Sequence, residues 1–107
     1  MNDRPTQLVA HATRFFSAHD EAAFFEWLDK LKCVADYHGE GRNLLIRLKD
    51  EPVDDASLRE LLALFSRYNI EMSQLAAFET DLNRAWFRAS NTYWHATVFK
   101  QTGKRRS

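Results

Sequence analysis

The sequence contains few of the residues that define several common protein classes. Its 107 residues include one cysteine, three glycines and two prolines. Because Cys33 is the only cysteine, an internal disulfide is impossible, and a single buried thiol fits a reducing compartment. So little glycine and proline argues against a loop-rich or all-β fold.

Residues 1–16 also lack a targeting or membrane signal. They contain no long apolar run, and Asp3 and Arg4 come early in the segment. A secretory signal or a membrane span needs a continuous apolar stretch. We therefore expect a cytoplasmic protein with no membrane association.

The chain nevertheless has enough hydrophobic material for one folded domain. Hydrophobic residues make up 45% of the sequence and aromatic residues 13%, which argues against wholesale disorder. A length of 107 residues corresponds to a single domain with its own core.

The chain carries no net charge, yet its charges are unevenly distributed. Residues 50–81 hold eight acids and two bases, a net of −6, whereas residues 82–107 hold six bases and no acid, a net of +6. Such a split is typical of an interaction surface. Alternatively, the two segments neutralise each other within the fold.

The clearest structural pattern covers residues 53–72. Asp54 suits a helix N-cap, because its carboxylate can accept from the free N–H groups of the first turn. Asn69 tolerates the left-handed conformation that ends a helix. The spacing predicts a helix with one apolar stripe, in which Leu61 and Phe65 are core residues. The stripe consists of Leu58, Leu61, Leu62, Phe65 and Tyr68.

A second helix and a hairpin precede this segment. Residues 21–31 repeat apolar side chains at helical spacing, and Asp20 is the expected N-cap. Residues 33–38 and 43–49 have strand character and flank the turn residues 39–41, which predicts a β-hairpin. Pro52 ends the second strand before the central helix.

Three segments are harder to interpret. We expect residues 1–12 to be a loose lead-in, and residues 13–17 to form either a short strand, which we favour, or the start of a helix. After Asn69, Ser73 can cap a helix. We expect a short helix that ends near Phe78 or Glu79 and is followed by a less regular segment. Alternatively, one longer helix is possible, because Leu75, Phe78, Leu82 and Trp86 share one helical stripe. The period of residues 91–99 fits both helix and strand.

Together these elements predict the α/β (α+β) class. We expect a small two- or three-stranded sheet with a β-hairpin and with helices packed on one face. The globular domain covers residues 13–99, and residues 100–107 form a frayed basic tail. A strand at residues 13–17 would form a right-handed βαβ unit with residues 33–38.

Three runs of sequence together resemble segments of known proteins. They are DEAAFFEWL at residues 20–28, LRELLALFSRYNI at residues 58–70, and YWH at residues 93–95. With these runs the chain resembles a group of short bacterial proteins that have no established activity. The resemblance spans residues 15–99 and implies no catalytic residue or cofactor, although some proteins of this size are immunity or accessory proteins.

Motifs for catalysis or metal binding are largely missing. None of the four histidines has a second histidine or a cysteine at metal-site spacing, and residues 39–41 lack the lysine of a phosphate-binding loop. Cys33 fits a small buried hydrophobe better than a nucleophile. We expect no enzyme activity, metal or cofactor.

An acidic group lies at the head of the central helix and consists of Asp50, Glu51, Asp54 and Asp55. We interpret these residues as capping the helix, although they could hold a cation or act as an acid/base pair.

Two surfaces are candidates for partner binding. An acidic face around residues 50–60 would suit a basic protein. The C-terminal third mixes aromatic and basic residues, which suits a protein interface or, alternatively, single-stranded nucleic acid. The same aromatic residues could instead close the core. We therefore predict a protein-binding module of the immunity, accessory or regulatory type, with unknown oligomeric state. Its candidate contact residues are Asp50, Glu51, Glu60, Arg84, Arg88, Trp94 and His95.

Overall fold

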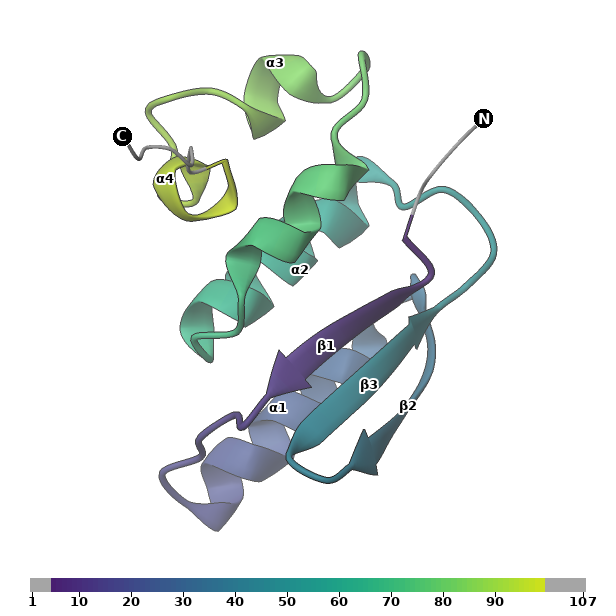
Figure 1. Cartoon of the computed structure of the whole chain (residues 1–107), viewed down its shortest axis with the longest axis vertical. Helices are drawn as coiled ribbons and strands as arrows, with labels where there is room; N and C mark the ends of the chain where they lie inside the picture. Colours follow the sequence, from purple (N-terminus) through teal and green to yellow (C-terminus); the bar gives the residue numbers. More distant parts are fainter. Residues whose placement is uncertain (1–4, 100–107) are drawn as a thin grey trace.

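A computed structural model describes residues 5–99 of the chain (Figure 1). Residues 5–99 form one three-stranded sheet together with helical segments, which confirms the α+β class. The elements in order are β1 (Gln7–His11), α1 (Ala18–Lys30), β2 (Val34–Glu40), β3 (Asn43–Leu48), α2 (Asp55–Arg67), the 3-10 helix η1 (Met72–Phe78), α3 (Arg84–Phe87) and α4 (His95–Val98). The expected basic tail at residues 100–107 lies outside the described residues.

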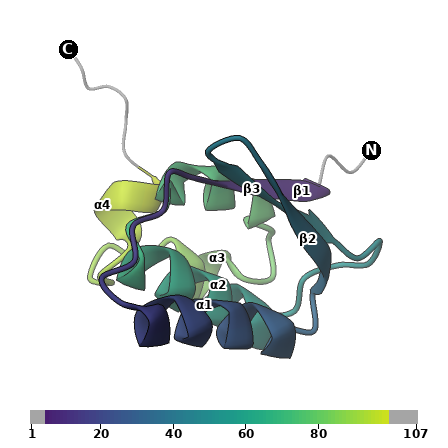
Figure 2. The ribbon, with the colours of Figure 1, turned by 90° about the horizontal axis from the view of Figure 1, so that it is seen from below.

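The sheet has the order β1-β3-β2, and both neighbouring pairs are antiparallel. β1 and β2 therefore run in the same direction on either side of β3. The βαβ unit expected from a strand at residues 13–17 is formed instead by β1, α1 and β2, with β3 between the two strands. Helices α1 and α2 lie on the same side of the sheet (Figure 2), as predicted.

The first strand lies earlier than predicted. Gln7–His11 forms β1, so this part of the expected lead-in belongs to the sheet, and residues 13–17 form no strand. Ala12 has a φ of 50°, which turns the chain out of the strand direction. After this turn Phe15 packs against the core while the side chain of Phe16 is exposed.

The hairpin of β2 and β3 confirms the prediction from the sequence. Glu40 pairs with Asn43 across a two-residue turn, and Gly41 has a φ of 63°, which glycine adopts without steric cost. Along β3, Ile46 and Leu48 are buried whereas Arg47 is exposed. The alternation therefore directs one face of the strand into the core.

The central helix α2 begins and ends as predicted. An oxygen of the Asp54 carboxylate accepts from the N–H of Ser57 at 2.9 Å. At the other end Asn69 has a φ of 59°, and the N–H of Ile70 donates to the carbonyl of Phe65 at 2.9 Å, which is the bond of a Schellman motif. Leu61 and Phe65 are completely buried.

Helix α1 begins three residues earlier than its predicted start. Ser17 is the N-cap instead of Asp20, because its hydroxyl accepts from the N–H of Asp20 at 3.1 Å. The Asp20 carboxylate in turn accepts from the N–H of Phe16 at 3.0 Å. The two side chains together cap the first turn and fix the loop that precedes it.

After α2 the chain forms short helical segments, as expected. η1 ends at Phe78, and the side chain of Asn83 accepts from the N–H of Thr80 and donates to the Phe78 carbonyl, which turns the chain. Glu71 caps η1, so the expected cap at Ser73 is wrong. Leu82 is 93% exposed, so it does not join the predicted apolar stripe.

The ambiguous segment at residues 91–99 contains no strand. A turn leads into the four-residue helix α4, whose Val98 is buried in the core. No helix within residues 5–99 is long and apolar enough to cross a membrane.

Candidate functional site

The acidic residues predicted to bind a partner lie on or before α2. Asp50 and Glu51 are exposed in the loop between β3 and α2, and Asp50 interacts with another residue. Glu60 is on the exposed side of α2, as predicted, yet its carboxylate accepts from the indole Nε1 of Trp27 at 2.9 Å. Glu60 therefore connects α2 to α1 through this hydrogen bond.

The acidic group at the head of α2 supports the capping interpretation. Besides its capping bond, the Asp54 carboxylate lies 2.8 Å from Lys32 Nζ, and these partners lower its pKa to about 2. The Asp55 carboxylate accepts from Nε1 of Trp86 at 3.2 Å. The described part of the chain contains no group of three or more histidine, cysteine, aspartate or glutamate side chains that could hold a metal ion.

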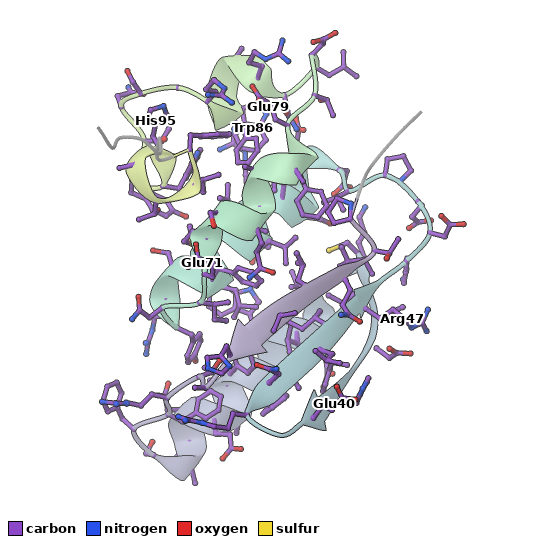
Figure 3. The ribbon with its side chains drawn as sticks, viewed as in Figure 1. Glu40, Arg47, Glu71, Glu79, Trp86 and His95 are labelled. Atoms are coloured by element: carbon purple, nitrogen blue, oxygen red, sulfur yellow. The ribbon has the colours of Figure 1, made fainter. Side chains whose placement is uncertain are left out.

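Two of the predicted basic contact residues bind one glutamate. Arg84 donates to a Glu79 carboxylate oxygen at 2.8 Å, and Arg88 donates to both oxygens at 2.7 and 2.8 Å. These guanidinium groups lower the pKa of Glu79 to about 2. Figure 3 places Glu79 and Trp86 in the same part of the molecule, far from Glu40 and Arg47 on the sheet.

The aromatic residues of the C-terminal third mostly close the core. Trp94 is only 7% exposed, and its Nε1 donates to the Phe87 carbonyl at 2.6 Å. Cations cover two further rings: the Arg59 guanidinium carbon lies 4.0 Å from the ring centre of Trp86, and that of Arg88 lies 4.2 Å from Phe99. Within residues 5–99 these contacts favour core closure over a stacking surface for nucleic-acid bases.

The two remaining residues with a predicted or possible chemical role lie elsewhere. His95 begins α4, is half-buried, and its ring centre is 5.7 Å from that of Phe99. Cys33 is buried and forms no disulfide, and burial raises the pKa of its thiol. A raised pKa keeps the thiol protonated, which is opposite to what a nucleophilic cysteine requires.

A hollow of about 360 Å³ lies elsewhere, between the end of β1, the hairpin turn and α1. Most side chains in its wall are apolar, although Thr13, Arg42 and Asn43 add polar surface. Gly39 and Gly41 border it and face open space, since a Cβ atom at either position would meet no other atom within 4 Å. We call this space the apolar hollow. Its apolar side chains are Ala10, Ala12, Phe15, Phe24, Phe25 and Leu44.

A second hollow of about 500 Å³ shares Ala12 and Thr13 with the first. Its wall is polar and includes Arg14, Arg67 and Asp20, with an oxygen of Asp20 3.6 Å from the Arg67 guanidinium. Thr13 Oγ1 is buried and has no hydrogen-bond partner in the described chain. An unpaired buried hydroxyl costs free energy of folding.

The loop between the two hollows carries an exposed aromatic side chain. Phe16 is 82% exposed. Ala12 lines both hollows, and its positive φ costs about 1–2 kcal/mol in a residue other than glycine. Residues with strained backbone angles persist only where the surrounding structure holds them, and they cluster at functional sites. The bond from the Ala12 N–H to the Arg42 carbonyl, at 2.7 Å, holds this turn.

None of the seven residues predicted from the sequence lines these two hollows. The adjacent Phe15 and Phe16 were the only signal in this segment, and they suggested a strand. We call the surface formed by the loop and the hairpin turn the loop face; it comprises residues 12–17 and 39–44.

Comparison with known proteins adds no functional information. No family model, curated protein or solved structure matches the chain. The resemblance to short bacterial proteins therefore stays a prediction.

Proposed function

We propose that this chain is a small protein-binding module and that its partner contacts the loop face. The main support is the position of Phe16, which is 82% exposed and lines the second, polar hollow, while its neighbour Phe15 lines the apolar hollow. Aromatic and arginine side chains around a pocket are typical of the residues that dominate binding energy in protein interfaces. The loop face combines Phe16 and Arg14 in one short segment.

The size of the apolar hollow favours a side chain of a protein over a complete small ligand. Small-molecule sites range from about 300 to 1,000 Å³ and bury most of their ligand. The apolar hollow is at the lower end of this range and opens beside Gly39 and Gly41. An apolar side chain of a partner would enter it while the partner's surface covers Phe16.

Charge supports an acidic partner for this face. Arg14 and Arg42 are exposed and form no ion pair with any residue in the 5–99 range, whereas Asp20 is engaged by Arg67 and by the N–H of Phe16. Two free guanidinium groups attract an acidic surface and accelerate association. This proposal differs from the basic partner expected from the acidic residues, several of which are occupied by contacts within the fold.

A comparison of two exposed apolar residues tests the proposal. Phe16→Ser removes the aromatic side chain from the loop face, and Leu82→Ser removes an aliphatic side chain that is 93% exposed between η1 and α3. Partners are captured from native lysate with each full-length variant after nuclease treatment. We expect Phe16→Ser to weaken capture of a specific protein about tenfold or more, and Leu82→Ser to leave it unchanged.

Other outcomes would contradict the proposal. Equal loss of partner capture with both variants would indicate non-specific binding to exposed apolar side chains. Loss of every captured molecule after nuclease treatment would favour the nucleic-acid alternative. Arg14→Gln provides a second check, because it should slow association and reduce its dependence on salt.

A further inference from the structure

The two edges of the sheet differ in how their outward backbone groups are satisfied. Antiparallel pairing leaves every second residue of an edge strand with its N–H and C=O directed away from the sheet. In β1 the even-numbered residues direct their backbone groups toward β3. At one end the Thr6 carbonyl accepts from the N–H of Leu48 in β3, and at the other the Ala12 N–H donates to the carbonyl of Arg42, in the turn before β3. Val9 therefore directs its groups outward.

The side chain of Gln74 covers this edge. Its Oε1 accepts from the N–H of Val9 at 2.9 Å, and its Nε2 donates to the Val9 carbonyl at 2.9 Å. Gln74 belongs to η1, so the chain itself supplies the two bonds that an added strand would make at the centre of β1. The β1 edge is thereby blocked to other strands.

No such cover exists on the opposite edge. Glu40 and Asn43 close the two-residue turn, so Glu40 and His38 direct their backbone groups to β3, and Tyr37 and Gly39 direct theirs outward. Between residues 5 and 99, no segment outside the sheet bonds to the outward groups of Tyr37 and Gly39. β2 is exposed over most of its length.

We propose that β2 pairs antiparallel with β2 of a second copy of this chain, which joins two sheets into one of six strands. When β2 pairs antiparallel with β2 of a second copy, a two-fold axis relates the two strands. Residues with outward-directed backbone groups must face each other across the new pair, which restricts where this axis can lie. With the axis at Tyr37, Tyr37 faces Tyr37 of the second copy, and Asp36 faces His38 of the second copy twice over.

Charge favours this register over its neighbours. Shifting the pairing by two residues in one direction would place Asp36 opposite Asp36 of the second copy, and in the other direction opposite Glu40. Like charges directly opposite each other destabilise strand pairs, and the register with Asp36 opposite His38 avoids this repulsion. Asp36 also binds Arg47 of its own chain, and His38 Nε2 lies 4.0 Å from Glu40, so both side chains are held on the helix-free face.

The interface is small, so we expect a weak dimer. One strand pair buries less than the roughly 1,200 Å² of a standard interface. Sedimentation velocity of the full-length chain from about 10 µM to 1 mM covers the affinity range expected for such a contact. The wild-type chain should change from monomer to dimer within this range and form no larger species, because the β1 edge is covered.

Matched proline substitutions test which edge is used. Gly39→Pro removes an outward N–H from β2 without removing an inward bond, and open space surrounds this position. Gln7→Pro removes the equivalent outward N–H from β1. Gly39→Pro should abolish the dimer and Gln7→Pro should preserve it, with circular dichroism confirming that both variants fold.

Substitutions of His38 test the register. His38→Lys should strengthen the dimer and His38→Asp should weaken it by about tenfold, because two symmetry-related pairs change together. Phe16→Ser should leave self-association unchanged, which separates this proposal from partner binding at the loop face. A monomer at every concentration, or a dimer lost with Gln7→Pro and kept with Gly39→Pro, would overturn the proposal.

Discussion

Glu79 offers the most informative single substitution in the fold. Its carboxylate binds Arg84 and Arg88 and so joins the acidic and basic halves of the uneven charge distribution. The side chain of Glu79 is 15% exposed, whereas those of Arg84 and Arg88 are 52% and 47% exposed. Glu79→Gln removes the negative charge, keeps the size of the side chain, and leaves the two arginines facing each other.

The magnitude follows from the pKa of Glu79, which falls from 4.5 to about 2 in the folded protein. A shift of this size corresponds to a ceiling of about 3 kcal/mol at neutral pH. Because water screens the half-exposed guanidinium groups, we expect Glu79→Gln to lower the free energy of unfolding by about 1–2 kcal/mol at pH 7.

The effect should depend on pH in a defined direction. A carboxyl group with a lowered pKa stabilises the fold fully above its unfolded pKa of 4.5, and this stabilisation is lost as the pH falls through about 2. The difference between wild type and Glu79→Gln should therefore shrink steadily between about pH 5 and pH 2. Other acidic groups titrate in both proteins and largely cancel from the difference.

Urea unfolding followed by circular dichroism at pH 7, 4 and 2.5 measures this difference. Asp81→Asn is the matched control, because Asp81 pairs with Arg84 but with no other cation in residues 5–99, and its side chain is 91% exposed. The control should change the free energy of unfolding by less than about 0.5 kcal/mol. A Glu79→Gln effect that equals the control, or that persists unchanged at pH 2.5, would refute the proposed role of the ion pairs.

Three further changes test the fold. Leu61→Ala opens a cavity beneath α2 and should cost about 2–5 kcal/mol of unfolding free energy, seen as a lower urea midpoint; an unchanged midpoint would remove α2 from the core. Ala12→Gly relieves the positive φ and should raise the melting temperature or leave it unchanged, whereas a clear decrease would show that the turn is unstrained. Asn83→Ala breaks the bonds to Thr80 and Phe78 and should cost about 1–3 kcal/mol by urea unfolding, with no loss expected if these bonds do not form.

The elements with strong local signals were predictable from the sequence. Asp54 and Asn69 mark the two ends of α2, because capping and left-handed residues act within one turn of the chain. The hairpin was predictable for the same reason, since Gly41 supplies the positive φ of its turn. The short strand β1 was missed because its five residues have little periodicity, and its pairing with β3 is a contact between distant segments.

The loop face could not be predicted from the sequence. Phe15 and Phe16 are adjacent and equally hydrophobic, and only the turn at Ala12 decides that one packs inward and the other is exposed. A positive φ at alanine has no sequence signature, unlike one at glycine. The ion pairs of the predicted basic contact residues could not be predicted for a related reason, because only the fold brings Arg88 and Glu79 together.

The most direct test of partner binding at the loop face is amide chemical-shift mapping. The isotope-labelled full-length chain is titrated with the protein captured through the Phe16 experiment. We expect the largest changes at residues 12–17 and 39–44, with residues 84–95 unaffected. Changes confined to α2 or to residues 84–95, with none in the loop face, would contradict the proposed site.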